Sequence, residues 1–177
     1  MKIRQVIPAD LEAAYKIEAS NFSPEEAASY EAVKSRIAKI PDTFLVAEID
    51  GQVAGYIEGP AVNVRHLTDD LFQTVVENPA TGGYIAVTSL SVAEDFKGQA
   101  VGTKLIAALK DLAREQKRDG ITLTCHDYLI SYYEKMALLT MVNHNLHMVV
   151  PSGMIWFGKI KLKLEKTRRL SMPTSFL

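Results

Sequence analysis

Cysteine and long apolar runs are almost absent from this sequence. Cys125 is the single cysteine among 177 residues, so the chain cannot close an internal disulfide, which fits a reducing compartment. No run of about 18 apolar residues is present, and the first residues lack a basic segment followed by an apolar one. We therefore expect a soluble, cytoplasmic protein that has no membrane partner.

The best-known phosphate-binding motifs are missing as well. The sequence contains neither the GKS or GKT ending of a nucleotide-binding P-loop nor a complete GxGxxG dinucleotide fingerprint. Metal-binding patterns are equally sparse. His144 and His147 have a spacing found in metal sites, but no carboxylate or cysteine stands near them. We expect no metal site.

The residues that are present suffice for one buried core. Hydrophobic residues make up 47% of the chain, and its length fits one α/β domain rather than two. The net charge of −1 is unevenly spread. Beyond Lys135, six basic residues face the single acid Glu165, so this tail carries +5 and the remainder −6. The tail also holds five of the six methionines and no aspartate, which marks a compositional break near residue 136.

Periodicity and turn signals predict a mixed order of strands and helices. The predicted strands are Lys2–Ile7, Thr43–Ile49, Gln52–Gly59, Tyr84–Val92 and Ile121–Cys125, with Asp50-Gly51 joining the second and third as a hairpin. The predicted helices lie after Asp10, over 23–40, from about Thr103 to Gly120, and over Leu129–Lys135. A polar loop, residues 60–83, precedes the fourth strand and includes a short helix around Leu67–Val76.

The predicted helices carry recognisable start and stop signals. Ser23 is expected as the N-cap of the second helix, with Pro24 at its first position and Glu26 completing a capping box. The same helix should end before Pro41. Gly120 is expected to act as the stop residue of the third helix.

The stretch from Leu90 to Leu109 is the most informative part of the chain. An apolar, β-branched run leads into the loop Lys97-Gly98-Gln99-Ala100-Val101-Gly102, and a helical pattern follows. A loop with little side-chain bulk lets successive backbone N–H groups converge, and the helix dipole adds partial positive charge at the same point. Such a site suits a pyrophosphate.

This layout resembles the signature of the GNAT superfamily, the acyl-CoA-dependent N-acyltransferases. In that signature, Arg or Gln, two residues, Gly, one residue and then Gly or Ala grip the coenzyme A pyrophosphate. Two positions depart from the pattern, because Lys97 stands where Arg or Gln is usual and Ala100 stands where Gly is usual. The order of predicted elements from Lys2 to Lys135 is also similar to the GNAT fold, a mixed central sheet flanked by helices.

Several stretches are similar to one branch of that superfamily, the aralkylamine N-acetyltransferases. They are IEASNFSPEEAAS, PDTFLVAEIDGQVAGYIEG, the pair Asn78-Pro79, SLSV, LTCHD and YYEK. The resemblance implies an α/β (α+β) fold and acetyl-CoA as co-substrate. It also implies that backbone groups of Leu90, Ser91 and Val92 pair with the pantetheine arm. The pyrophosphate would then lie on Lys97, Gly98, Gln99, Ala100, Val101, Gly102 and Thr103.

The resemblance also suggests which residues would carry protons. A tyrosine on the short helix after the fifth strand is the general acid of the family, and Tyr133 holds that position. A phenol with a pKa near 10 stays protonated at neutral pH and can protonate a departing thiolate. The base is left open. The histidine pair that animal enzymes use is matched by Ala86 and Thr88, so that device is missing.

Other groups are candidates for the base. His126 has a suitable pKa and follows a predicted strand near the expected acceptor site. Glu25, Glu26 and a water relay are the alternatives. Cys125 has no paired base in the sequence, so we interpret it as a small buried residue rather than a nucleophile.

The tail after YYEK departs from the family pattern. Permissible codons for MALLTMVNHNLHMVVPSGMIWFGK, read from one nucleotide earlier, can encode NGFTNHGESQSTHGGAVWYDMVWE, which is similar to the expected continuation. This favours a reading-frame shift close to Lys135. The alternative is a divergent natural ending in which MIWFGKIKLKL forms a strand. We thus divide the chain into a GNAT core, 1–135, and an anomalous segment of the same domain, 136–177.

The sequence therefore predicts an acetyl-CoA-dependent N-acetyltransferase that acts on a primary amine of a small molecule, such as an arylalkylamine or a polyamine. The alternative is an acetyl-CoA-binding module that is catalytically impaired or regulatory. A nucleic-acid partner is not expected, because the basic tail is short and lacks interleaved aromatic residues. Apolar tail residues such as Trp156 and Phe157 would favour self-association, so a homodimer is expected.

Overall fold

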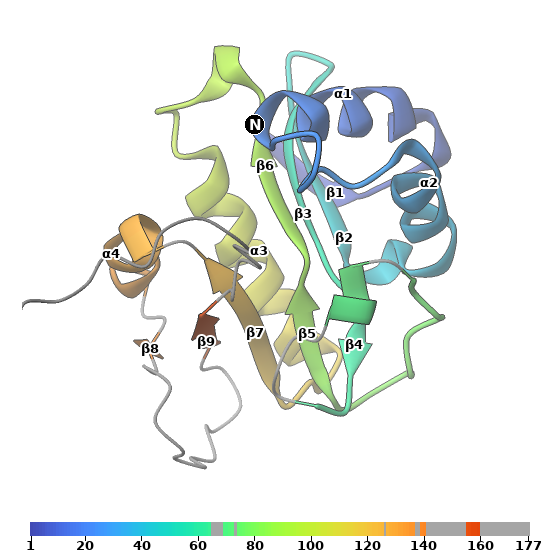
Figure 1. The fold of residues 1–177 in the computed structure, drawn as a ribbon, viewed down its shortest axis with the longest axis vertical. Coiled ribbons are helices and arrows are strands. Elements are labelled where there is room, and N and C mark those ends of the chain that lie inside the picture. The colour runs from blue at the N-terminus through green and yellow to red at the C-terminus, as the bar shows by residue number, and fades with distance from the viewer. Residues whose placement is uncertain (65–68, 73, 126, 137–138, 141–154, 160–177) are drawn as a thin grey trace, which may run out of the picture.

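The computed structural model describes residues 1–64, 69–72, 74–125, 127–136, 139–140 and 155–159 of the chain (Figure 1). The strands are β1 (Lys2–Gln5), β2 (Phe44–Ile49), β3 (Gln52–Glu58), β4 (Ala61–Val62), β5 (Tyr84–Val87), β6 (Ser89–Val92), β7 (Gly120–Cys125), β8 (Leu139–Thr140) and β9 (Ile155–Lys159). The helices are α1 (Leu11–Asn21), α2 (Tyr30–Lys39), α3 (Val101–Glu115) and α4 (Ile130–Glu134).

The strands form two sheets that meet between β5 and β6. The first sheet has the order β1-β2-β3-β6 and is antiparallel throughout. The second has the order β4-β5-β7-β9-β8, and β5 runs parallel to β7. This mixed α+β architecture with flanking helices confirms the predicted fold class.

The predicted hairpin is confirmed. β2 and β3 pair antiparallel from Phe44↔Glu58 to Ile49↔Gln52. Asp50 and Gly51 both have positive φ, 50° and 78°, which is the backbone of a type I′ turn and suits an Asp-Gly pair. The turn therefore fixes the register of β3, the strand that pairs with β6.

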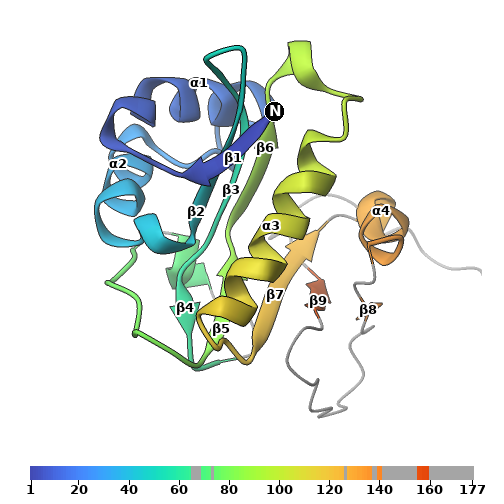
Figure 2. The same cartoon turned by 180° about the vertical axis from the view of Figure 1, so that it is seen from behind.

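Helices cover both faces of the sheets. On one face, α3 packs against a core that includes Leu45, Ile57 and Leu105 (Figure 2). On the other face, α1 and α2 cover a second cluster that includes Phe44 and Tyr56 (Figure 1). β2 contributes to both clusters, which explains why its first four residues are all buried.

The start predicted for the second helix is wrong. Residues near Ser23 form a turn, and α2 begins at Tyr30 with Ser29 as its N-cap. The Ser29 side chain accepts a hydrogen bond of 3.2 Å from the Ala32 N–H. The Ser23 hydroxyl instead donates a hydrogen bond of 3.1 Å to the Glu26 carboxylate. The capping pattern was present in the sequence, but the second of two serines supplies the cap.

The end predicted for the third helix is also wrong. α3 ends at Glu115, and Gly120 is the first residue of β7. Lys117 takes the left-handed conformation, with φ 53°. Arg118, which is buried, then donates hydrogen bonds to the carbonyl groups of Pro79 and Gly82. These contacts turn the chain earlier than the glycine signal indicated.

Two smaller expectations are confirmed at least in part. The short helix predicted over Leu129–Lys135 is α4, preceded by a 3-10 turn over Asp127–Leu129. Within the 60–83 loop, a 3-10 turn occupies Asp69–Phe72, whereas 65–68 and residue 73 lie outside the described residues. Over the part of the chain that the structure describes, no helix combines the length and apolarity needed to cross a membrane.

The reassigned cap gives a direct test. Ser29→Ala removes the acceptor of the Ala32 N–H and should lower the free energy of unfolding by about 1 kcal/mol. Ser23→Ala removes only an exposed contact and should change it by less than about 0.5 kcal/mol. Urea unfolding of both variants measures the difference. An equal loss in the two, or a larger loss for Ser23→Ala, would contradict the assignment.

Candidate functional site

The run predicted as one strand, Tyr84–Val92, is divided at Thr88. Ile85 and Val87 face the core beside α3, so strict alternation would place residues 89 and 91 there too. Instead Leu90 and Val92 pack against that core. The side-chain phase shifts by one residue between β5 and β6, as at a β-bulge. The prediction of a single strand is corrected in this way, and the two halves join different sheets.

The division opens one edge of β6. β5 pairs with β7 only as far as Val87↔Leu123, and β6 pairs with β3 alone among the described strands. Figure 1 shows β6 leaning toward α1 while β7 runs toward α4. Parallel strands that separate in this way leave main-chain groups without a ladder partner between them.

Antiparallel geometry identifies those main-chain groups. The Ala93 N–H donates to the Ala54 carbonyl at 2.9 Å, and hydrogen-bonded positions alternate along an antiparallel pair. Ser91 therefore turns its main-chain groups to β3, whereas Leu90 and Val92 turn theirs to the edge facing β7. The Val92 carbonyl already accepts a bond of 3.0 Å from the Asn21 side chain. The Leu90 N–H and C=O and the Val92 N–H remain along this edge.

The loop after β6 presents further N–H groups. Gly98 has φ 78° and Ala100 has φ 59°, so the chain twists twice through the left-handed region before α3. The helix starts at Val101, two residues before the expected Thr103. The first bond back to the cap runs from the Lys104 N–H to the Ala100 carbonyl, at 3.1 Å.

The first turn of α3 therefore has the character of an anion site. The N–H groups of Val101, Gly102 and Thr103 have no partner within the helix, and Ala100 provides no side-chain cap. The helix dipole places partial positive charge there. The Lys97 ammonium lies in the same loop and pairs with the Glu94 carboxylate at 2.5 Å, with both side chains largely exposed.

Two glycines allow the surrounding elements to approach this turn. A Cβ on Gly55 would lie 2.7 Å from the Ser91 carbonyl oxygen and 3.2 Å from Val101 Cγ1, so glycine lets α3 begin close to the sheet. A Cβ on Gly102 would lie 2.7 Å from the Tyr132 hydroxyl. α4 is thus held against the start of α3, a contact that sequence analysis missed.

The two tyrosines of α4 have different environments. Tyr133 is 7% exposed and belongs to the core beside α3, whereas Tyr132 is 37% exposed. Their rings meet edge to face with centroids 5.2 Å apart. Burial raises the pKa of the Tyr133 hydroxyl above its ordinary value, and the neighbouring Cys125 contributes in the same direction. The Tyr133 phenol is therefore protonated throughout the neutral range.

Among the described residues, the structure supports no role in proton transfer for the other candidates that the sequence proposed. His126 lies outside the described residues. Glu25 and Glu26 are exposed on the turn before α2. Cys125 is buried and forms no disulfide, which confirms its interpretation as a small buried residue. Within the described ranges, no group of three or more His, Cys, Asp and Glu side chains is arranged to hold a metal ion.

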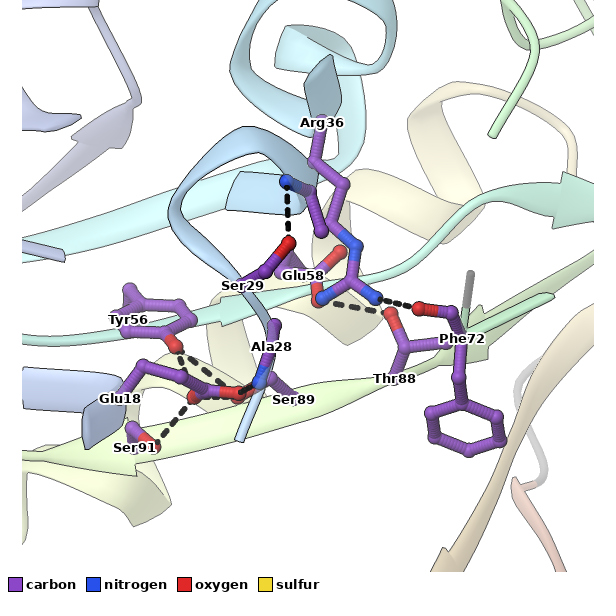
Figure 3. Close-up of polar contacts among 11 residues, drawn as sticks. Glu18, Ala28, Ser29, Arg36, Tyr56, Glu58, Phe72, Thr88, Ser89 and Ser91 are labelled. Carbon is purple, nitrogen blue, oxygen red and sulfur yellow. Dashed lines mark hydrogen bonds and ion pairs between the residues drawn. The ribbon is translucent and has the colours of Figure 1, made fainter. Parts of the chain in front are cut away.

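Two buried carboxylates that were not predicted from the sequence lie on the face covered by α1 and α2 (Figure 3). Glu18 of α1 is 3% exposed and accepts from the Tyr56 hydroxyl, from Ser89 Oγ at 2.8 Å and from Ser91 Oγ at 3.3 Å. The Ala28 N–H donates to its other oxygen at 3.1 Å. Glu18 thereby joins the α1–α2 connection to β6.

The second buried carboxylate is Glu58, at the end of β3. Its Oε1 accepts from Arg36 at 2.9 Å and from Thr88 Oγ1 at 2.7 Å. Arg36 also donates to the Phe72 carbonyl at 2.8 Å, which ties the 60–83 loop to α2. A glutamate at the end of an apolar strand was the available sequence signal, because charged residues are rarely buried without a role.

The left-handed backbone of Ala100 leads to a prediction. A Cβ in this conformation costs about 1 kcal/mol, so Ala100→Gly should raise stability by up to that amount and raise Tm by about 2–4 °C. Ala107→Gly, the same change at an exposed position inside α3, should lower stability by about 1 kcal/mol. Calorimetry of the two variants checks the opposite signs. A lower Tm for Ala100→Gly would show that the methyl group makes a stabilising contact.

Comparison with known proteins agrees with this geometry. Similar solved structures include Ard1 from Thermoplasma volcanium, at 24% identity and TM-score 0.59, over 80% of this chain and 84% of that one. A GNAT family acetyltransferase from Brucella melitensis in complex with acetyl-CoA is 24% identical, with TM-score 0.55 over 78% and 82% of the two chains. Glucosamine-6-phosphate N-acetyltransferase from Arabidopsis thaliana is 19% identical, with TM-score 0.54 over 83% and 95%.

These likenesses show a shared fold. No curated protein matches the chain. The profile of the acetyltransferase (GNAT) family matches residues 11–137, which cover both the divided strand and the loop before α3. This chain belongs to the acetyltransferase (GNAT) family.

Proposed function

We propose that this protein transfers the acetyl group of acetyl-CoA to a primary amine of a small molecule, such as an arylalkylamine or a polyamine. The observation that carries the proposal is the continuity between the open edge of β6 and the N–H groups of the next helix. The first feature suits an extended amide-containing arm, and the second suits a diphosphate. Coenzyme A contains both in that order.

The chain's own residues suggest how the coenzyme would be held. The N–H groups from Gly98 to Thr103 would receive the pyrophosphate, and the Lys97 ammonium would add a charge. Its pairing with Glu94 is between exposed groups and is therefore weak enough to be exchanged for a phosphate. Leu90 and Val92 would pair with the pantetheine amides. Ser91 would support the strand through its bond to Glu18 rather than face the coenzyme.

The chemistry requires little more than positioning and proton transfer. A neutral amine attacks the thioester carbonyl, a main-chain N–H on β6 stabilises the oxyanion, and the C–S bond breaks. Tyr133 would protonate the departing thiolate, for which its raised pKa is suitable because the phenol stays protonated. The charge of −6 on residues 1–135 favours cationic acceptors.

The competing proposal is a coenzyme-binding module with impaired or regulatory function. It is favoured by Ala86 and Thr88, which stand where the resembled animal enzymes have histidines. It is also favoured by the altered tail, which follows the core that we place at 1–135. The family match ends at residue 137, close to that boundary.

Replacement of the proposed acid separates the two functions. Tyr133→Phe should leave the acetyl-CoA Kd by calorimetry unchanged within about twofold. It should slow thiol release with the fastest of 2-phenylethylamine, tryptamine and spermidine by about 100-fold. The matched control is Tyr132→Phe, which should keep the rate. In the wild type, the alkaline fall of kcat should lie above pH 10, because the Tyr133 pKa is raised.

Other outcomes have clear meanings. Acetyl-CoA binding by the wild type without turnover of any of these amines would favour the module. Turnover that is equal in Tyr133→Phe and wild type would remove Tyr133 from the mechanism. Absence of acetyl-CoA binding would overturn the proposed site.

The compositional break near residue 136 predicts a one-base insertion or deletion in the gene. If a reading-frame shift produced residues 136–177, the coding sequence should differ from that of close relatives by a one-base insertion or deletion near the Lys135 codon. Sequencing the gene and comparing it with the homologous genes of close relatives checks this. Codons that align with close relatives without an indel would contradict the frameshift and favour a divergent natural ending.

A further inference from the structure

Two adjacent hydroxyl groups mark the point where β5 passes into β6. Because the side-chain phase changes there, Thr88 and Ser89 both extend to the face covered by α1 and α2 (Figure 3). Thr88 donates to Glu58 at 2.7 Å, and Ser89 donates to Glu18 at 2.8 Å. Each hydroxyl therefore donates a hydrogen bond to a different buried carboxylate.

The two carboxylates are not equivalent. Glu18 accepts four hydrogen bonds, from Tyr56, Ser89, Ser91 and the Ala28 N–H, and both of its oxygens are engaged. Glu58 is 1% exposed, and its Oε2 has no hydrogen-bond partner among the described residues. A buried carboxylate oxygen without a donor is a costly feature that calls for a functional explanation. Glu58 is thus the less compensated of the two carboxylates, and the Thr88 hydroxyl already donates to its Oε1.

The two hydroxyl groups also differ, because the one that bonds Glu18 is more deeply buried than the one that bonds Glu58. Ser89 is 3% exposed, whereas Thr88 is half-buried. Thr88 stands two residues before Leu90, about 7 Å along an extended chain, on the strand that would hold the pantetheine arm. An acceptor amine that reaches the thioester at this point of β6 would meet Thr88 before it meets Glu58.

We propose that Thr88 and Glu58 form the relay that removes a proton from the acceptor ammonium group. This inference rests on the acetyl transfer proposed above and supplies its missing base. The relay would replace the histidine pair of the resembled animal enzymes, because Thr88 matches one of those histidines. It would take the role for which His126, Glu25 and Glu26 were candidates.

The proton balance closes without a further reagent. The ammonium gives a proton to Thr88 Oγ1 while the Thr88 hydroxyl proton passes to Glu58. The neutral amine attacks, the C–N bond forms and the C–S bond breaks. Tyr133 protonates the departing thiolate and regains a proton from the nitrogen of the N-protonated amide that is left. Glu58 then releases its proton to water, so the reaction yields amide, thiol and one proton.

The charges around Glu58 suit this role. Among the described residues, Arg36 of α2 is the cation paired with Glu58, and Glu18 of α1 lies near enough to oppose its ionisation. Tyr56 and Thr88 add to its polar surroundings. Burial is the largest influence and raises the pKa of Glu58, which Arg36 partly offsets. Glu58 is therefore a stronger proton acceptor than an exposed carboxylate, and activity should fall as pH drops toward its raised pKa.

The test is the pH profile of Thr88→Val, a variant of nearly the same shape without the hydroxyl. With the fastest amine of the panel, kcat/KM below pH 7 should fall about 100-fold. The deficit should shrink as pH approaches about 10, where an alkylamine is already neutral and needs no relay. Thr88→Ser, which restores a hydroxyl, should recover most of the rate. Glu58→Gln combined with Thr88→Val should be no slower than Thr88→Val alone.

A matched control removes a buried hydroxyl elsewhere. Thr43 is fully buried and accepts from the Asn78 side chain at 2.8 Å, so Thr43→Val reproduces the structural loss away from β6. It should show no pH-dependent deficit. A Thr88→Val deficit that is constant across pH, or no deficit, would overturn the relay while leaving acetyl transfer intact. Absence of wild-type turnover despite acetyl-CoA binding would overturn acetyl transfer, and the relay with it.

Discussion

The change of side-chain phase at Thr88 determines how the two sheets and the groups around them are arranged. It divides one run of chain between two sheets, so that β5 stays with β7 while β6 stays with β3. Gly59 makes the division feasible, because a Cβ there would lie 2.0 Å from the Ala86 carbonyl oxygen. The open edge of β6, the approach of α3 and the pair of hydroxyls at Thr88 and Ser89 all follow from this single irregularity.

The two buried carboxylates help to hold that irregularity in place, and their burial is energetically unfavourable. Burial of an ionised group without compensation is strongly unfavourable, and breaking a buried ion pair typically costs about 3–5 kcal/mol. Glu18 is compensated by hydroxyl and N–H donors, whereas Glu58 has Arg36 and Thr88 on one oxygen. Each carboxylate connects a helix of the covering layer to the divided strand. The α1–α2 layer is therefore positioned by electrostatics as well as by apolar contacts.

Local signals in the sequence were sufficient for most of the fold but not for the site. The Asp50-Gly51 turn and the apolar strands depend on neighbouring residues, and they were predicted correctly. The helix start at Ser29 required a choice between two serines, which only tertiary packing decides. The division at Thr88 could not be predicted, because the strand-forming residues Tyr84–Val92 have the same pattern whether they join one sheet or two. The side-chain partners of the two carboxylates lie 22 to 73 residues away in sequence, beyond any local pattern.

The two halves of the proposed site tolerate sequence change differently. The coenzyme half that we propose consists of main-chain N–H and C=O groups. Its binding capacity would therefore be kept with Lys97 and Ala100 in place of the usual residues, provided that the backbone path is kept. The acceptor half that we propose would depend on side chains of α1, α2, β3 and the Thr88–Ser89 pair, where a single replacement would change the chemistry. All of these side chains precede residue 90, and β7 and α4 separate them in sequence from residues 136–177. The proton path that we propose toward Glu58 would therefore be encoded entirely in the part of the chain that the family profile matches, whatever the origin of residues 136–177.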